Sequence, residues 1–453
     1  MNFLSRFFVL ILLPLGLLAV PPKPNIIMIL CDDLGYGDLG ITGHPYAKSP
    51  NIDRLAKEGI QFTQAYQSSA WCAPSRYALM SGVYPARKFQ HTLEMNTAEP
   101  NLYRILDTAG YRTGHFGKWH MSGRAADALI PADYGVHEYF IHNGNDEGWT
   151  PKEKRAPHWR EQSTAHYVDR SIEFIKKQKE SDQPFYVNLW VYPTHSYIDP
   201  IPEMLEEYKD LEVNIDDFEN PLMREFLNWI SEQGDLQDAM RAYCADITEL
   251  DKQVGRLMHF LQDAGLDEST MVIFASDNGP PPLDPAHYLD DLTERMQKRP
   301  TLINCVGSAG PYRARKMSLN DGGVRTPLFV RWPGMIPAGK LNHETIFTGV
   351  DWLPTLASVA NAQTPANLDG VDLAEALFGA KIERAKVHFW NDRSGWTTLR
   401  DKQWKAHLQE GQLRLFDIIQ DPSESNDVSQ QFPEISKDYA QRLQDFEASI
   451  SRN

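Results

Sequence analysis

The chain contains four β-type runs, each followed at once by a polar cluster. They are NIIMIL at 25–30, the shorter YRTGHF at 111–116, FYVNLWV at 185–191 and MVIFAS at 271–276. Continuous apolar runs of this length predict strands of a sheet that is buried on both faces. The clusters CDDLGYGD, GKWH, YPTH and DNG come directly after them, so we expect these polar residues at the ends of the strands.

Helices are predicted between the strands. The stretch SPNIDRLAKEG at 49–59 has Ser49 at the N-cap, Pro50 in the first turn and Gly59 as a stop signal. A second helix, ending at Gly265, presents one apolar face at alternating spacings of three and four: Met240, Tyr243, Ile247, Leu250, Val254, Leu257 and Leu261. Alternating strands and helices predict an α/β fold with a largely parallel sheet. Such sheets place their ligand sites beyond the carboxyl ends of the strands.

The pattern changes after about residue 383. KVHFW, GWTTLRD, QWKAHLQ and LRLFDII are typical of short strands with tight turns, and FPEISKDYAQRLQDFEASI predicts a final helix. A chain of 453 residues is also long for one simple core. We therefore predict a catalytic domain at 21–382 and a small antiparallel subdomain with one helix at 383–453.

Residues 1–20, MNFLSRFFVLILLPLGLLAV, are predicted to lie outside the fold. They contain one cation, Arg6, and an apolar run that holds Pro14 and ends near Ala19. The run is short and no comparable run follows, which favours a cleaved secretory signal over a membrane anchor. No cysteine follows directly, so a lipid anchor is not expected. The mature protein is predicted to be secreted or periplasmic.

Net charge and cysteine content exclude some classes of function. The formal net charge of −16 argues against binding to nucleic acid or to anionic membranes, although a local group of cations can still bind an anionic substrate. No CxxC pair or zinc spacing occurs among Cys31, Cys72, Cys244 and Cys305. Cys244 and Cys305 could pair in a disulfide, and buried free thiols are the alternative.

Two of the strand ends carry oxygen ligands. Asp32 and Asp33 follow the first strand, and Asp277 and Asn278 follow another. Three carboxylates and one amide are a set that suits a hard divalent cation. Calcium fits better than zinc, which prefers histidine or cysteine, and we expect calcium rather than magnesium. One acidic pair alone would equally form a turn or a helix cap, but the second pair at an equivalent strand end favours a metal.

Several cations occur in the polar clusters and near the cysteine at 72. Each of them alone would most simply be a surface charge or a packed histidine: Arg76, Lys118, His120, His195 and Lys316. Beside a metal, on an otherwise acidic chain, they predict a site for a multiply charged oxyanion.

Residues 72–82, CAPSRYALMSG, resemble the signature of type I sulfatases, C-x-P-S-R-x-x-L-x-T-G, with Ser81 in place of the usual threonine. Further segments resemble the family in the family's order, from about residue 23 to about residue 430: DDLGYGDLG, SPNIDRLAKEGIQFTQAY, GYRTGHFGKWH, SDNG, GGVRTPLFVRWPG, VDWLPTLASVA, LDGVDL and LFDIIQDPSESNDV. The resemblance implies an alkaline phosphatase-like fold. That fold has a large mixed, mostly parallel sheet between helices and a small C-terminal antiparallel sheet with a helix.

The resemblance also implies an unusual nucleophile. In this family the cysteine, here Cys72, is oxidised to formylglycine by a maturation enzyme that reads the Cys-x-Pro-Ser-Arg string. The hydrated aldehyde carries two hydroxyls on one carbon. One attacks sulfur and displaces the alcohol, and the other then loses its proton so that the aldehyde re-forms and sulfate leaves. The metal ligands carried over are modified Cys72, Asp32, Asp33, Asp277 and Asn278.

The remaining roles are carried over residue by residue. Arg76 matches the residue that holds the nucleophile, and Lys118 and Lys316 match the pair that neutralises sulfate oxygens. His120 matches the partner of the second hydroxyl, which acts as base. His195 matches the residue near the bridging oxygen, which acts as acid for the leaving alcohol, alone or with Lys316.

The sequence departs from the family pattern in places that concern the substrate. Asp321-Gly322-Gly323 stands where relatives often have Glu-Gly-Gly. The stretch 281–309 is long and predicts either a lid beside the site or a surface excursion. HNGNDEGW at 142–149, PHW at 157–159 and NDRSGW at 391–396 mix aromatic and hydrogen-bonding residues, as sugar sites and solvated loops both do.

These observations predict an exported sulfate-ester hydrolase that acts on a sulfated saccharide. Two alternatives stay open at this stage. One is a phosphate or phosphonate ester hydrolase on the same scaffold. The other is a glycan-binding module without catalysis, in which Cys72 is unmodified.

Overall fold

The computed structural model describes residues 23–88, 94–123, 128–142, 158–196, 198–281, 305–392 and 394–450. The predicted signal at 1–20 lies outside these residues. Within the described ranges, no helix combines the length and the apolar character needed to cross a membrane.

The described residues form one large sheet of eight strands, in the order β5-β4-β6-β1-β7-β8-β2-β9. Their bounds are β5 (Glu138–His142), β4 (Arg112–Lys118), β6 (Phe185–Thr194), β1 (Asn25–Asp32), β7 (Thr270–Ser276), β8 (Leu328–Arg331), β2 (Ile60–Phe62) and β9 (Lys340–Asn342). Strand β8 is antiparallel to both of its neighbours, and the other pairs are parallel. The mixed, mostly parallel sheet is therefore confirmed, and the four strands expected from the sequence are its adjacent strands β4, β6, β1 and β7.

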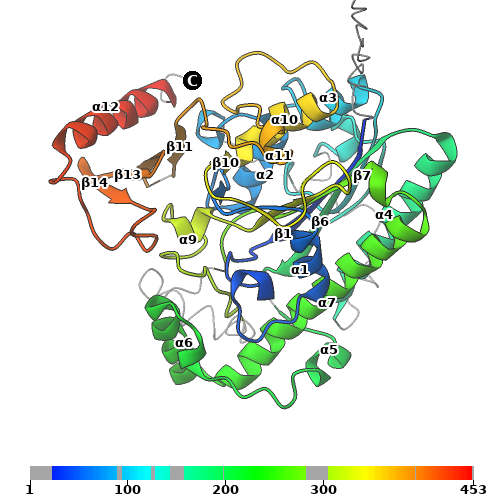
Figure 1. Ribbon diagram of the computed structural model, residues 1–453, viewed down its shortest axis with the longest axis horizontal. Coiled ribbons are helices and arrows are strands. Elements are labelled where there is room, and N and C mark those ends of the chain that lie inside the picture. The colour runs from blue at the N-terminus through cyan, green and yellow to red at the C-terminus, as the bar shows by residue number, and fades with distance from the viewer. Residues whose placement is uncertain are drawn as a thin grey trace, which may run out of the picture.

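Helices cover both faces of this sheet (Figure 1). One face carries α1 (Pro50–Lys57), α4 (Trp159–Ser181), α5 (Pro202–Glu206), α6 (Pro221–Gln233) and α7 (Leu236–Asp263), and the other carries α2 (Cys72–Ser81), α3 (Leu102–Thr108), α10 (Trp352–Val359) and α11 (Ala374–Leu377). Side chains of β1 alternate between the two cores, with Ile27 and Ile29 in one and Ile26 and Met28 in the other. Burial on both faces explains why this strand is apolar from residue 26 to residue 31.

Shorter elements connect the layers. They are the strand pair β3 (Ala65–Tyr66) and β10 (Phe347–Thr348), the one-turn helix α9 (Asp321–Val324), and 3-10 helices at Gly40–Thr42, Pro85–Arg87, Pro131–Tyr134, Ile215–Asp217, Asp267–Ser269 and Gly349–Asp351.

The ends of α1 differ from their prediction in detail. Ser49 occupies the N-cap position, but its hydroxyl donates to Asp53 at 2.8 Å and accepts from the Gly40 amide at 2.9 Å, so it does not cap the helix. Gly59 is required by close packing instead of by a left-handed stop, because a Cβ there would lie 2.2 Å from the Val330 carbonyl oxygen. Helix α7 ends as predicted, with Gly265 in the left-handed region at φ 67°.

The C-terminal residues form a four-stranded antiparallel sheet in chain order, within the described part of the chain. The strands are β11 (His388–Asn391), β12 (Thr397–Asp401), β13 (Trp404–Gln409) and β14 (Gln412–Asp417), and α12 (Pro433–Ile450) packs on them (Figure 1). This confirms the predicted elements, and the boundary at 382–383 stays a prediction. Trp390, Trp396 and Phe416 share a buried cluster with Tyr66 and Leu319 of the main domain, so the two parts pack together.

Candidate active site

Four neighbouring parallel strands end in the predicted site residues. Strands in a sheet lie about 4.8 Å apart, so side chains at adjacent strand ends are close neighbours. The residues at these strand ends are Lys118 at the end of β4, His195 just after β6, Asp32 and Asp33 at the end of β1, and Asp277 and Asn278 after β7.

Cys72 is the first residue of α2 and faces this edge of the sheet. Its side chain is buried, with 7% exposed, and its Sγ lies 3.5 Å from Nδ1 of His120. The Sγ and one carboxylate oxygen each of Asp32 and Asp277 all lie within 4.8 Å of one another. The cysteine thus stands between an imidazole and two acids at a helix N-terminus, where the helix dipole favours negative charge.

Arg76, one turn after Cys72 on α2, is fully buried and pairs with Asp277. Its Nε and Nη2 donate to Oδ2 of Asp277 at 2.9 and 2.6 Å, and its Nη1 donates to the Lys118 carbonyl at 3.3 Å. The guanidinium also lies 4.9 Å from the centre of the Trp190 ring. Burial raises the pKa of Asp277 to about 6, although the charge of Arg76 acts in the opposite direction.

Two buried lysines neutralise the acids of β1. Lys118 Nζ donates to Asp32, and Lys316 Nζ donates to Oδ1 of Asp33 at 2.5 Å. Burial alone would raise the pKa of Asp32, but the nearby charges of Lys118, His195 and Arg76 hold it well below 3.8. The pKa of Lys316 is raised despite burial, chiefly by Asp33. The site therefore contains ionised acids and cations side by side.

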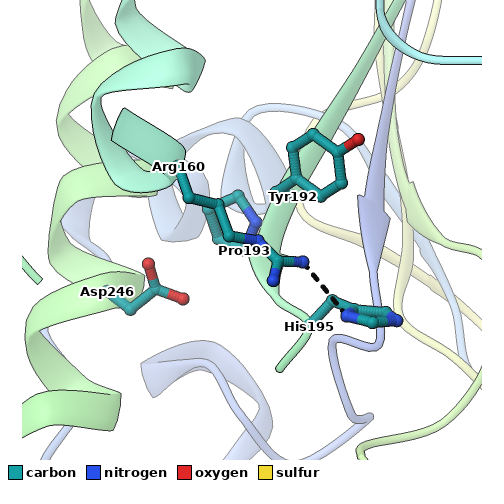
Figure 2. Close-up of a pocket in the computed structure, with 5 residues that line it drawn as sticks. All are labelled: Arg160, Tyr192, Pro193, His195 and Asp246. Atoms are coloured by element: carbon teal, nitrogen blue, oxygen red, sulfur yellow. Dashed lines mark hydrogen bonds between the residues drawn. The ribbon is translucent and has the colours of Figure 1, made fainter. Parts of the chain in front are cut away.

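His195 lies on the other side of Asp33, with its Nε2 3.8 Å from Oδ2. It lines a small pocket with Arg160, Tyr192, Pro193 and Asp246 (Figure 2). Arg160 reaches from the start of α4, donates from Nη2 to Nδ1 of His195 at 3.1 Å, and lies 4.7 Å from the centre of the Tyr192 ring. Burial lowers the pKa of His195 to about 4, although Asp32 and Asp33 act in the opposite direction.

The donor set fits a hard cation. Asp32 Oδ1, Asp33 Oδ2 and Asn278 Oδ1 are buried and accept no hydrogen bond from the described residues. Buried oxygens are normally satisfied, and such atoms gathered at one place are what an oxygen-seeking ion such as Ca²⁺ requires. The one sulfur and the nearby histidine, which suit zinc, are a minority of the set.

The structure brings together every residue that the sequence predicted for the site. Sequence reasoning missed Arg160, although it directly follows the stretch PHW that the sequence singled out. Trp71, which precedes Cys72, is 43% exposed. In the sequence, this tryptophan stands immediately before the signature at 72–82.

Other sequence expectations are corrected or lie outside the described residues. All four cysteines are buried free thiols, so Cys244 and Cys305 do not form a disulfide. Trp396 of NDRSGW is not a sugar platform, because its indole is buried and donates to His407 at 3.0 Å. Residues 282–304 of the long stretch, 143–149 of HNGNDEGW and Pro157 of PHW lie outside the described residues.

Comparison with known proteins decides the family. The profile of the family described as sulfatase matches residues 24–362. The chain belongs to the sulfatase family. A second profile, described as the C-terminal part of N-sulphoglucosamine sulphohydrolase, matches residues 307–449 of this sulfatase. The chain is therefore a sulfuric ester hydrolase, with the α/β fold expected of that family.

Individual relatives match this sulfatase over most of its length. Human arylsulfatase A is 30% identical over 435 residues, which cover 86% of this chain and 76% of the relative. Canine N-acetylgalactosamine-6-sulfatase is 28% identical and covers 90% of this chain and 82% of its own. The crystal structure of Ps i-CgsB in complex with k-i-k-neocarrahexaose is 25% identical, with a TM-score of 0.75 and coverage of 94% and 92%.

Proposed function

We propose that this sulfatase removes sulfate from a carbohydrate, using formylglycine made from Cys72 and a bound Ca²⁺. The observation that carries the proposal is the position of Cys72. It heads a helix, lies 3.5 Å from His120, and lies beside two acids at the edge of the sheet. A buried thiol that only fills space in a core would not need an imidazole and two acids beside it.

Asp32, Asp33, Asp277 and Asn278 would hold the ion together with the side chain at position 72. Bound there, Ca²⁺ would polarise a sulfate oxygen and favour ionisation of an attacking hydroxyl. The three oxygens that accept no hydrogen bond from the described residues support this ligand set.

The surrounding side chains supply the rest of the chemistry. Lys118 and Lys316 bind the outer oxygens of the sulfate group and neutralise its charge. The hydrated aldehyde at position 72 would offer two hydroxyls on one carbon. His120 accepts the proton of the second hydroxyl when sulfate is released. His195 is the acid expected on the leaving side, but burial lowers its pKa to about 4. We therefore propose that the neutral ring donates a hydrogen bond from Nε2 to the alcohol oxygen and that the ammonium of Lys316 supplies the proton to that oxygen.

Maturation is proposed to precede folding. Of the recognition string, Cys72, Ser75 and Arg76 are 7%, 1% and 0% exposed, and Pro74 is half-buried. A maturation enzyme could not read this string in the folded chain. We therefore place the oxidation of Cys72 on the unfolded chain, as it is exported behind the signal predicted at 1–20.

Two observations favour a saccharide as the substrate. Trp71 directly precedes Cys72, so their Cα atoms lie about 3.8 Å apart, and its indole is 43% exposed and could present a flat face to a sugar ring. In addition, one similar protein is named for a sugar, N-acetylgalactosamine-6-sulfatase, and one similar structure is a complex with k-i-k-neocarrahexaose.

The test is sulfate release from a panel of defined sulfated mono- and oligosaccharides. The wild type should release sulfate, and its Cys72 peptide should carry the aldehyde mass. Cys72→Ser should fold and lose turnover, whereas Cys244→Ser, at a buried thiol on α7, should keep it. Full turnover by Cys72→Ser contradicts the proposal.

The same samples separate the alternatives. Faster turnover of an aryl phosphate than of the matching aryl sulfate would indicate a phosphate or phosphonate hydrolase. An unmodified thiol at Cys72 in active-site peptides from a competent host, with saccharide binding but no release, would indicate a binding protein.

A further inference from the structure

Lys316 lies in a tight loop at residues 313–325, which we call the Lys316 loop. Ala314 and Met317 on either side of the lysine have left-handed backbones, at φ 62° and 77°. Non-glycine residues in this region cost about 1–3 kcal/mol each and persist only where surrounding contacts hold them. The position of Lys316 thus depends on what fixes its loop.

The loop is attached to the active site through its backbone. The Lys316 amide donates to the Pro280 carbonyl at 3.0 Å, and the Met317 amide donates to the Ala70 carbonyl at 2.9 Å. The loop also closes on itself, because the Gly322 amide donates to the Arg313 carbonyl at 2.8 Å. A Cβ at Gly322 would lie 2.2 Å from the Ala314 carbonyl oxygen, so the closure leaves no space for another residue.

Glu424, in the C-terminal subdomain, holds the loop on both sides of Lys316. Its Oε1 accepts from the Asp321 amide at 3.1 Å, and its other oxygen accepts from the Asn320 side-chain amide. Its backbone carbonyl accepts from Nη1 of Arg313 at 3.0 Å. One residue therefore fixes the segment before the lysine and the segment after it.

A buried cation keeps Glu424 ionised. Lys405 on β13 is fully buried and places its Nζ 2.8 Å from Glu424 and 2.7 Å from Asp321 of the loop. Burial alone would raise the pKa of Glu424, and Asp321 acts in the same direction, but Lys405 and His407 lower it. Hydrogen bonds to an ionised carboxylate are stronger than those between neutral groups. Water cannot replace the carboxylate of Glu424 as a partner, because this side chain is fully buried.

We propose that Glu424 is a positioning residue for the reaction, which acts by fixing Lys316 against the substrate sulfate. The inference rests on the role proposed for Lys316 under the function above. It makes the C-terminal subdomain a working part of the active site, although Glu424 itself does not touch the reacting atoms.

A double-mutant cycle tests the proposal, with Glu424→Gln, Lys316→Ala and the two combined. Glu424→Gln should lower kcat for a sulfate ester by about 10- to 100-fold, the loss expected from a small misplacement of a catalytic group. In the Lys316→Ala background it should have no further effect, because there is no lysine to position. A purely structural role would lower the rate by the same factor in both backgrounds.

Controls separate misfolding and failed maturation from mispositioning. Each variant is checked for its melting temperature and for the aldehyde mass at Cys72. Glu410→Gln makes the same change at an exposed position of the same subdomain and should leave kcat unchanged. If Glu424→Gln does not fold, Asn320→Ala removes one bond to Glu424 and should give a smaller loss that also vanishes without Lys316.

The outcomes are distinct. Additive losses, or no loss in Glu424→Gln and Asn320→Ala, overturn the inference while leaving the proposed function intact. Wild-type turnover in Lys316→Ala overturns both the inference and the role proposed for that lysine.

Discussion

Arg76 and Asp277 form a fully buried ion pair, in which two guanidinium nitrogens donate to one carboxylate oxygen at 2.9 and 2.6 Å. The pair joins α2, which carries the nucleophile position, to the end of β7, which carries proposed metal ligands. Removing one partner leaves the other charged and desolvated.

Arg76→Met should therefore destabilise the fold by about 3–5 kcal/mol, the cost of an uncompensated buried charge. The comparison is made by denaturant unfolding in a Cys72→Ala background, so that neither protein carries the aldehyde. A loss below about 1 kcal/mol would mean that Asp277 is protonated in the folded protein without cost.

Calcium should stabilise the protein independently of catalysis. At a free concentration of 100 times Kd, a bound ion contributes about 2.7 kcal/mol to stability. A chelator should lower the melting temperature, and Ca²⁺ should restore it more fully than Mg²⁺. Asp33→Asn should weaken Ca²⁺ binding in calorimetry, whereas Asp238→Asn, at a side chain that is 73% exposed, should not. Equal binding by both variants would contradict the proposed ligand set.

Trp71→Ala should raise KM for a sulfated saccharide by about tenfold, which corresponds to the loss of about 1.4 kcal/mol of binding. The change in kcat should be small, because Trp71 is proposed to contact the sugar ring and not the sulfate. Leu222→Ala, at another exposed apolar side chain, is the control and should change neither constant. A fall in kcat at constant KM would assign Trp71 to the chemical step instead.

Arg160→Gln should slow the cleavage of poor leaving groups selectively. A guanidinium can only donate, so its contact with Nδ1 of His195 leaves the ring proton on Nε2, which faces the site. The Ser196 carbonyl, which can only accept, lies 2.7 Å from the same Nδ1 and favours the other tautomer, so a ring proton on Nε2 is what this variant tests. We expect about a tenfold loss with an alkyl sulfate and less than about twofold with nitrophenyl sulfate, whose alcohol needs little help.

The control for Arg160 is Arg170→Gln on the same helix, where the side chain is 50% exposed. Equal losses with both substrates in Arg160→Gln would show that Arg160 supports the fold and does not act through His195.

Stability should fall in acid through the buried charges of Asp321 and Glu424. Both carboxyls have folded pKa values below their ordinary values of 3.8 and 4.5, because their neighbours together outweigh the effect of burial: Lys405 and Arg325 for Asp321, and Lys405 and His407 for Glu424. The unfolded chain then binds more protons, so the stabilisation is present above about pH 4.5 and is lost as the pH falls.

The measurement is the melting temperature from pH 7 to pH 3.5. Buried acids with raised pKa values, such as Asp251 at about 6, act in the opposite direction and are common to all variants. The difference between wild type and Glu424→Gln should therefore shrink as the pH falls below 4.5. A difference that stays constant would show that Glu424 is not ionised in the folded protein.

The sequence predicted the centre of this fold well because its signals there are local. Strands β1, β6 and β7 are apolar at nearly every position, and helix α7 repeats its apolar residues at helical spacing. Strands β2, β3 and β10 have only two or three residues each, which is too short for a periodic pattern. Strand β2 pairs with β8 and β3 pairs with β10, and in each case the partner is distant in sequence.

The same distinction between local and long-range signals applies to the residues of the site. The oxygen ligands and cations could be found because they follow predicted strands or match a signature. Glu424 could not be assigned, because its partners Arg313 and Asn320 lie more than 100 residues away. Arg160 reaches His195 only through the placement of α4 over the end of β6. No spacing along the chain reports such contacts.

The four adjacent strands that end in the site residues separate the groups that carry out the chemistry from those that contact the sugar, and this separation matters for engineering. The distances among these groups are fixed by the hydrogen-bond lattice of a sheet covered by helices on both faces, and the connecting loops do not set them. The Trp71 side chain can then be exchanged to admit a different sugar without altering the chemistry at the strand ends. Directed evolution of this enzyme toward new sulfated polymers should therefore tolerate diversity at the rim and reject it at the strand ends.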